Sequence, residues 1–162
     1  MAGKSGNSML AAGATAPSVS LRDLAGNAVS LRQLSQEGPV LLAFFKGSCP
    51  VCQYTLPFLD RATDNGNIRI VCVSQDSASE TTEFAQAFRL RLPMFTDNRG
   101  DGYAASNAFG ITHVPSMFQL EPDGSVSHAW TGWSKSEMQS LAGRTGAPVI
   151  QPGEQVPAFR PG

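Results

Sequence analysis

Two cysteines, Cys49 and Cys52, are separated by two residues and are the strongest chemical signal in the chain. Two thiols at this spacing can form a disulfide or exchange one with another molecule, provided that one of them ionises readily. The same spacing also occurs in half of a zinc site, which needs two further cysteine or histidine ligands. The other candidates are Cys72, His113 and His128, which form no second pair at ligand spacing. The pattern therefore favours thiol–disulfide chemistry over a zinc site or an inert pair on a structural helix.

The surrounding residues predict a strand that ends just before this pair and a helix that begins at it. The apolar run 39–45 is typical of a strand buried on both faces, and the apolar spacing that follows predicts a helix over 50–63. Cys49 then falls at the N-cap, where free backbone N–H groups and the helix dipole stabilise an anion. Pro50 suits the first helical position. We expect Cys49 to be the nucleophile and Cys52, one turn later, to resolve a mixed disulfide.

The rest of the chain predicts alternating strands and helices. Further strands are predicted at 19–21, 28–30, 68–74, 94–96, 116–121 and 126–130. Further helices are predicted from 77 to about 88, near 103–109 and from 134 onward. This order is a β-hairpin, then βαβαβ, then ββα. It predicts an α/β fold with right-handed crossovers and a mixed sheet.

Length and charge exclude several classes of protein. A chain of 162 residues is the size of one domain, and its formal net charge of −1 comes without a basic cluster, so we expect no nucleic-acid partner. No apolar run is long enough to span a bilayer. The N-terminus lacks the apolar core of a signal peptide, which predicts a cytoplasmic protein as the chain is written and a periplasmic or exported one if a leader has been removed. We expect a monomer.

The two ends differ in composition from the middle. Residues 1–15 are small and polar and are predicted to be flexible, residues 16–144 to form the folded domain, and residues 145–162 to form a proline-rich tail. The tail prolines are Pro148, Pro152, Pro157 and Pro161. They favour extended backbone, so we expect a loosely held strap or a disordered tail, with a docked tail as the alternative.

Several segments, taken in order, resemble the thioredoxin superfamily, and more closely its TlpA/ResA-like and AhpC/TSA-like branch. The resemblance covers residues 16–143. The segments that carry it are Phe44-Phe45-Lys46-Gly47-Ser48-Cys49-Pro50-Val51-Cys52, Val73-Ser74-Gln75-Asp76, Ala108-Phe109-Gly110-Ile111, Val114-Pro115-Ser116 and Pro122-Asp123-Gly124. The resemblance implies a thioredoxin-like fold, with a central mixed sheet flanked by helices and the N-terminal hairpin as an extension.

The resemblance also implies a thiol–disulfide oxidoreductase that needs no cofactor beyond its Cys49–Cys52 disulfide and no metal. Pro115 is expected to be cis, and the Val114 backbone to offer strand-like hydrogen bonds to a substrate. Pro50 and Val51 are expected to add to the substrate-binding surface. The implied partners are protein or small-molecule thiols and disulfides, together with an upstream redox partner.

Three positions depart from the family pattern. Thioredoxin proper has a buried aspartate where this chain has Ala43, and TlpA-like proteins often have a glutamate where it has Thr55. Neither acid is available to accept the proton of Cys52, so the base for that step is open. Ser48 replaces the familiar tryptophan before Cys49, which alters the expected recognition surface.

Two other functions are compatible with the same resemblance. A peroxiredoxin-like thiol peroxidase, with an antioxidant role, would need a Pro-x-x-x-Thr/Ser-x-x-Cys register and an arginine, and neither cysteine has that register. A non-enzymatic Cu(I)-binding or adaptor domain could use Cys49, Cys52 and His113, because soft thiolates favour Cu(I). We expect His113 instead to be a surface residue, and Cys72, between two valines, to be a buried small hydrophobe.

Overall fold

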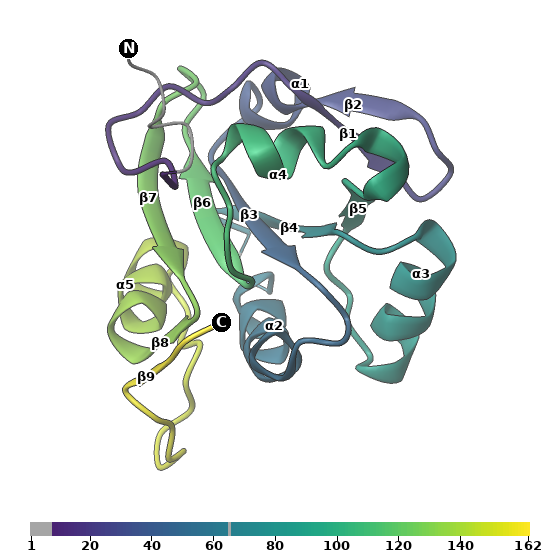
Figure 1. The fold of residues 1–162 in the computed structure, drawn as a ribbon. Coiled ribbons are helices and arrows are strands. Elements are labelled where there is room, and N and C mark those ends of the chain that lie inside the picture. The colour runs from purple at the N-terminus through teal and green to yellow at the C-terminus, as the bar shows by residue number, and fades with distance from the viewer. Residues whose placement is uncertain (1–7, 65) are drawn as a thin grey trace.

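The computed structural model describes residues 8–64 and 66–162, and its main feature is a seven-stranded mixed sheet with helices on both faces (Figure 1). The strands are β1 (Ser20–Asp23), β2 (Ala28–Ser30), β3 (Val40–Phe45), β4 (Arg69–Ser74), β5 (Met94–Thr96), β6 (Ser116–Leu120) and β7 (Val126–Thr131). Their order across the sheet is β2-β1-β5-β4-β3-β6-β7. Strands β3, β4 and β5 are parallel, and the other neighbouring pairs are antiparallel. This confirms the predicted mixed α/β fold.

The helices divide the core between the two faces of the sheet. They are α1 (Leu31–Ser35), α2 (Pro50–Ala62), α3 (Ala78–Ala87), the 3-10 turn η2 (Arg99–Asp101), α4 (Ala104–Ala108) and α5 (Lys135–Thr145). Alternate residues of β3 face opposite sides, as the period of a strand requires. Leu41 and Phe45 pack with α2, α3 and α5, whereas Leu42 and Phe44 pack with α1 and α4.

Strand β3 runs through the centre of the sheet, and all six of its residues are buried. It pairs with β4 in parallel and with β6 in the antiparallel direction. Residues 46–49 follow the carboxyl end of β3 and lead to the start of α2. The start of α2 therefore lies at the end of a central strand. This is the position that the sequence predicts for the cysteine pair.

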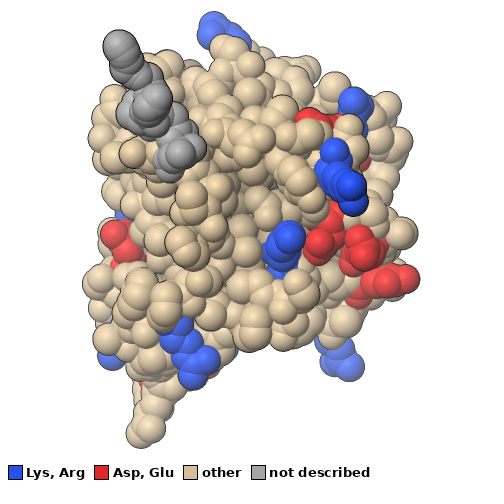
Figure 2. Space-filling view, in the orientation of Figure 1, with Lys and Arg blue, Asp and Glu red and all other residues tan. Residues whose placement is uncertain are grey.

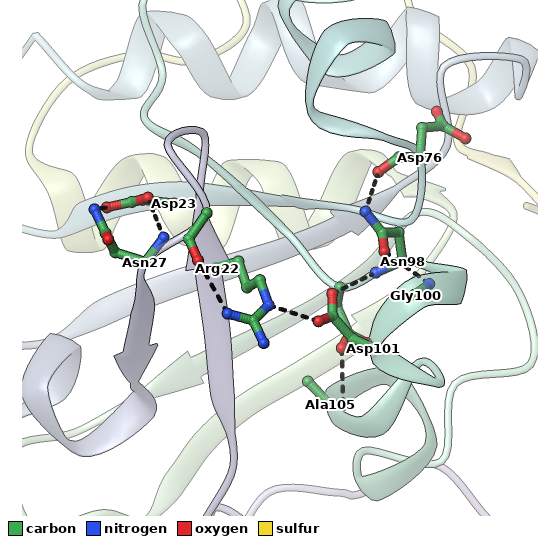
Figure 3. Close-up of polar contacts among 10 residues, drawn as sticks. Arg22, Asp23, Asn27, Asp76, Asn98, Gly100, Asp101 and Ala105 are labelled. Atoms are coloured by element: carbon green, nitrogen blue, oxygen red, sulfur yellow. Dashed lines mark hydrogen bonds and ion pairs between the residues drawn. The ribbon is translucent and has the colours of Figure 1, made fainter.

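The predicted N-terminal hairpin is present and is joined to the main sheet. Strand β1 pairs with β2 on one side and with β5 on the other. Gly26 has a φ of 92°, which the turn between the strands requires, and the Asp23 carboxylate accepts the Asn27 N–H at 2.9 Å. Arg22 and Asp101 form an ion pair of 2.7 Å that connects β1 to η2 (Figure 3). The hairpin is thus one edge of the sheet.

Part of the segment predicted to be flexible, residues 1–15, is ordered. Residues 1–7 lie outside the described part of the chain, whereas residues 8–15 lie along β7 and α4. Leu10 N–H donates to Phe109 O at 3.0 Å, Gly13 N–H to Val126 O at 2.8 Å, and Val126 N–H to Ala14 O at 2.8 Å. Residues 8–15 therefore have backbone partners that their composition does not reveal.

The C-terminal tail is docked in the structure, as in the alternative that the sequence left open. Strand β9 (Phe159–Arg160) pairs with β8 (Trp133–Ser134) in a separate two-stranded sheet. Val149 is fully buried, and Arg61 forms a bidentate ion pair with Glu154 at 2.7 and 2.8 Å. The prolines do give extended backbone, but they do not leave the tail free.

The face of the molecule in Figure 2 carries few charged side chains. On the face seen in Figure 2, acidic side chains gather over α3 and basic ones are scattered. Among residues 8–64 and 66–162, no helix is both long enough and apolar enough to cross a bilayer. The face shows no basic stripe of the kind that binds nucleic acid.

Candidate active site

Cys49 lies at the junction of the β3–α2 loop with the helix and acts as the helix N-cap. Its backbone is extended (φ −85°, ψ 117°), and Pro50 occupies the first turn, where its missing N–H costs no helical hydrogen bond. The Cys49 Sγ accepts the Cys52 N–H at 3.2 Å. This sulfur therefore takes the role that a serine or aspartate oxygen takes in other helix caps, and a negative charge on it is stabilised by the helix start.

A second contact brings the sequence-predicted groove residues to the same sulfur. The Cys49 Sγ donates to the Val114 carbonyl at 3.5 Å, and the Val114–Pro115 peptide bond is cis. Cys49 and Val114 are half-buried and Pro115 is buried. Val51 is half-buried and Pro50 is exposed on the first turn of α2. The structure thus gathers the predicted site residues around one accessible sulfur.

Two side chains that the sequence analysis assigned no role fix the loop before Cys49. Gly47 N–H donates to the Asp76 carboxylate at 2.8 Å, and the Gln53 amide donates to Gly47 O at 2.8 Å. The backbone carbonyl of Asp76 accepts from the Asn98 amide at 3.3 Å, while its carboxylate points the other way (Figure 3). The loop is therefore held at both polar groups of Gly47. The 29-residue separation of Asp76 from Gly47 hides this contact from sequence patterns.

Cys52 is fully buried behind Cys49, and its thiol resists ionisation. Burial raises the pKa of Cys52 strongly, the hydrogen bond with Cys49 raises it further, and the charges of Cys49 and Asp76 act in the same direction. These causes penalise a negative charge on Cys52 and together outweigh a backbone hydrogen bond at Lys46, which acts in the opposite direction. The two thiols of the pair therefore have opposite environments.

Cys72 lies in the middle of β4, opposite Ala43, and is fully buried, as predicted. Burial raises the pKa of its thiol, and the nearby Asp60 carboxylate raises it further. That carboxylate is itself held by Arg91, whose backbone N–H and Nε donate to it at 2.7 and 3.0 Å. Cys72 is therefore placed to fill the core and not to react with a substrate.

The positions of the two family acids are held by Ala43 and Thr55. Ala43 is buried in β3 between Cys72 on one neighbouring strand and Met117 on the other. Thr55 is fully buried in α2, and its Oγ1 has no hydrogen-bond partner among the described residues. Asp76 is the acid whose charge reaches Cys52, and it comes from the end of β4.

The copper alternative would use His113, which precedes Val114, the residue whose carbonyl contacts the Cys49 sulfur. His113 is exposed, and its Nδ1 lies 2.9 Å from Thr112 Oγ1. Within residues 8–64 and 66–162, no three His, Cys, Asp or Glu side chains are grouped so that they could hold a metal ion. His113 is thus a surface residue, as expected.

The AhpC/TSA family model matches residues 12–144. The chain belongs to the AhpC/TSA family. One relative is the thiol-disulfide oxidoreductase ResA of Halalkalibacterium halodurans. It is 26% identical over 135 residues, and the match covers 81% of this chain and 74% of the relative. The thiol-disulfide oxidoreductase YkuV of Bacillus subtilis is 28% identical over 118 residues, 68% of this chain and 78% of that one.

Solved structures share the fold of this AhpC/TSA-family chain. The thioredoxin domain of a thiol-disulfide oxidoreductase from Bacteroides vulgatus superposes with a TM-score of 0.66 and 23% identity, covering 76% of this chain and 91% of that one. A secreted disulfide oxidoreductase of Mycobacterium tuberculosis gives a TM-score of 0.60 and 20% identity, covering 80% and 95%. These matches confirm the predicted thioredoxin-like fold.

Proposed function

We propose that the protein is a thiol–disulfide oxidoreductase in which Cys49 is the nucleophile and Cys52 the resolving thiol. The observation that carries the proposal is the asymmetry of the pair. Cys49 is accessible and its sulfur accepts a helix-start N–H at 3.2 Å, whereas Cys52 is enclosed immediately behind it. The relatives ResA and YkuV, which match 81% and 68% of this chain, are named thiol-disulfide oxidoreductases.

The reaction needs only the two sulfurs. The Cys49 thiolate attacks a substrate disulfide, a new S–S bond forms, and one substrate sulfur leaves as a thiolate. The Cys52 thiolate then attacks the Cys49 sulfur, which releases the second substrate sulfur and leaves a Cys49–Cys52 disulfide. Two electrons pass from the protein to the substrate, and the leaving thiolates take up the protons that Cys49 and Cys52 lost. The same steps in reverse oxidise a substrate dithiol.

The mixed disulfide itself lowers the barrier to the second step. While Cys49 is a thiolate, its hydrogen bond and its charge both raise the pKa of Cys52. Once Cys49 is bonded to a substrate sulfur it is neutral, and both of these causes disappear. Burial and the Asp76 charge remain, so resolution is expected to accelerate with rising pH.

The substrate is proposed to lie against the Val114–Pro115 turn, with Pro50 and Val51 on the helix side. The Val114 carbonyl contacts the Cys49 sulfur, so a polypeptide joined to that sulfur passes beside this carbonyl. Strand-like hydrogen bonds between the Val114 backbone and a substrate backbone would bind extended segments with little regard to their sequence. The partners are therefore protein or small-molecule disulfides and thiols, with a second redox protein to restore the pair.

The peroxidase alternative is not favoured by the surroundings of the sulfurs. With Cys52 as the peroxide-reactive residue, the proline and threonine positions of that register are Phe45 and Cys49. Strand β6 begins with Ser116 after Val114-Pro115, where the family's arginine is expected. Among the described residues, the hydrogen-bond partners of Cys49 Sγ are the Cys52 N–H and the Val114 carbonyl, and neither carries the positive charge with which an arginine stabilises a departing hydroxide.

We propose an exported setting for this activity rather than the cytoplasmic one that the sequence favours. The support is the secreted Mycobacterium tuberculosis disulfide oxidoreductase of the same fold. Fractionation of the source cells tests this, with the thiol state of Cys49 and Cys52 trapped by alkylation. Recovery of the protein with cytoplasmic markers would contradict it.

The redox potential of the Cys49–Cys52 pair tests the proposed function. Equilibration in glutathione or dithiothreitol buffers is expected to give a two-electron couple between about −270 and −120 mV. A value near the low end indicates a reductant and one near the high end an oxidant. Cys72→Ser should keep the couple, whereas Cys49→Ser and Cys52→Ser should each abolish it. If the wild-type pair formed no reversible disulfide, the function would be wrong.

A further inference from the structure

Residues 157–162, which we call the strap, lie along one wall of the active site. The Trp133 indole N–H donates to Pro157 O at 2.7 Å, and Lys135 N–H donates to Ala158 O at 2.9 Å. Strand β9 then pairs with β8, with Arg160 opposite Trp133. In Figure 1 the yellow end of the chain passes beside β8 and finishes next to α2. The strap thus runs from α5 toward the helix that carries the cysteines.

The tip of the strap contacts the turn that faces Cys49. Gly162 packs against the Val114 carbonyl so closely that a Cβ on it would clash with that oxygen. The Arg160 guanidinium lies over the Tyr54 ring, 5.4 Å from its centroid, and Tyr54 is two residues past Cys52. The Arg160 carbonyl packs against Gly132 in the same way. The strap therefore occupies the space between α2 and the Val114–Pro115 turn.

The Val114 carbonyl is the point where the strap and a substrate meet. It accepts the hydrogen bond from Cys49 Sγ at 3.5 Å and is also the atom against which Gly162 packs. A polypeptide joined to Cys49 through a disulfide needs room beside this carbonyl, and the strap already fills it. We propose that the strap is a built-in competitor that determines specificity by excluding extended polypeptides until it is displaced. This inference rests on the proposed function.

The strap is built to move on a fixed base. Residues 158–162 of the strap are exposed, Phe159 by 55%, so few buried contacts hold the tip. The base is anchored, because Val149 is fully buried, its carbonyl accepts from Arg61 at 2.9 Å, and Arg61 pairs with Glu154. Displacing residues 160–162 breaks the pairing with β8 and the contact with Tyr54, and leaves the base in place. Opening therefore does not require unfolding of the domain.

The two classes of substrate should respond differently to the strap. A small disulfide needs only the Cys49 sulfur, so a docked strap leaves its reaction unchanged. A polypeptide binds only to molecules whose strap is open, and its apparent affinity is reduced by the fraction of time for which the strap is open. The strap should therefore raise KM for protein disulfides and leave kcat unchanged.

Two variants displace the tip without disturbing the buried bonds. Gly162→Ala places a methyl group against the Val114 carbonyl, and the exposed tip is the partner that can yield. Deletion of residues 160–162 removes the tip but keeps Pro157 and Ala158, so the Trp133 indole N–H stays paired. The matched control is Gly143→Ala, a helical glycine at which an added Cβ meets no atom within 4 Å.

The measurements are the kinetics of reduction of insulin, a protein disulfide, and of bis(2-hydroxyethyl) disulfide, a small one, with dithiothreitol as the reductant. We expect Gly162→Ala and the deletion to lower KM for insulin by about three- to tenfold, with the small disulfide and Gly143→Ala unchanged. An unchanged or raised KM for insulin in an otherwise active protein would overturn the strap alone. A wild-type protein that reduced neither substrate would overturn the proposed function and, with it, the inference.

Discussion

Cys49 and Cys72 lie on neighbouring parts of the same fold, and only one of them is placed for chemistry. Cys49 lies where β3 ends and α2 begins, half-buried, with an N–H donor and a carbonyl acceptor at its sulfur. Cys72 lies in the middle of β4, fully enclosed, with its backbone paired on both sides. The loop end of a strand offers access and unpaired backbone groups, and the middle of a strand offers neither.

Cys52 shows that burial alone does not separate the two kinds of site. It is as buried as Cys72, and burial raises the pKa of both thiols. What distinguishes Cys52 is its neighbour, because one helical turn brings its backbone N–H to the Cys49 sulfur. A buried thiol beside an accessible one can resolve a mixed disulfide, whereas a buried thiol among valines can only fill space.

The largest expected difference between the two regions is in activity. Cys49→Ser should lower disulfide reduction by about a thousandfold or more, because the attacking sulfur is lost. Cys72→Ser should leave the rate within about twofold of wild type, because its side chain does not reach the substrate. Insulin reduction measured in parallel, with equal folded protein verified by circular dichroism, checks both. If Cys49→Ser stayed active and Cys72→Ser did not, Cys72 and not Cys49 would be the reactive residue.

The second expected difference appears in the stability at alkaline pH. The folded-state pKa values of Cys52 and Cys72 are raised above the ordinary value of 9.0. Above about pH 9 the unfolded chain therefore loses protons that the folded protein keeps. The free energy of unfolding should fall as pH rises, by up to about 1.4 kcal/mol per pH unit for each thiol. Well below pH 9 both thiols are protonated in the folded and the unfolded states, so neither contributes to the slope.

Urea denaturation between pH 7 and pH 10 measures this slope. Cys72→Ala should reduce this slope by the contribution of one buried thiol. All other titrating groups are present in both proteins, so their contributions cancel when the slope of the variant is subtracted from that of the wild type. A slope that Cys72→Ala leaves unchanged would mean that Cys72 ionises as freely in the folded state as in the unfolded one.

The third difference is the stability cost of Cys72→Ala at pH 7. The change removes a buried sulfur from β4, in the core cluster that also contains Leu56 and Leu59 of α2. We expect a loss of about 1 kcal/mol, typical of deleting one buried heavy atom, with no change in redox potential. The midpoint of urea denaturation measures the loss. A loss above about 3 kcal/mol would show that Cys72 has a stronger structural role than packing.

The elements around the cysteines could be predicted from the sequence because their signals are local. The apolar run of β3, the proline after Cys49 and the apolar spacing of α2 each act within one element. Helix α1 was missed although its signal is present, since Ser30 and Gln33 form a capping box at its start. Five residues are too few to show a helical period.

The contacts that act on the site from a distance could not be predicted. The Asp76 bond to Gly47 and the pairing of β9 with β8 join residues far apart in sequence, and no periodicity or motif encodes them. The prolines of the tail predict extended backbone but not the surface on which it lies. Tertiary contacts between short irregular segments depend on the finished fold, so they become visible only with it.

The smallest effect is expected from Asp76, whose charge acts on Cys52 and whose carboxylate accepts the Gly47 N–H. Asp76→Asn keeps an oxygen to accept the Gly47 N–H and removes the negative charge that raises the pKa of Cys52. Resolution of a mixed disulfide should then reach the same rate at a pH lower by about 0.5 unit. The measurement is the pH profile of substrate release after rapid mixing. The matched variant Asp76→Ala also loses the bond to Gly47, so it should slow the first attack by Cys49 as well. If the Asn and Ala variants behaved alike, with the pH profile unmoved, Asp76 would act only through the loop.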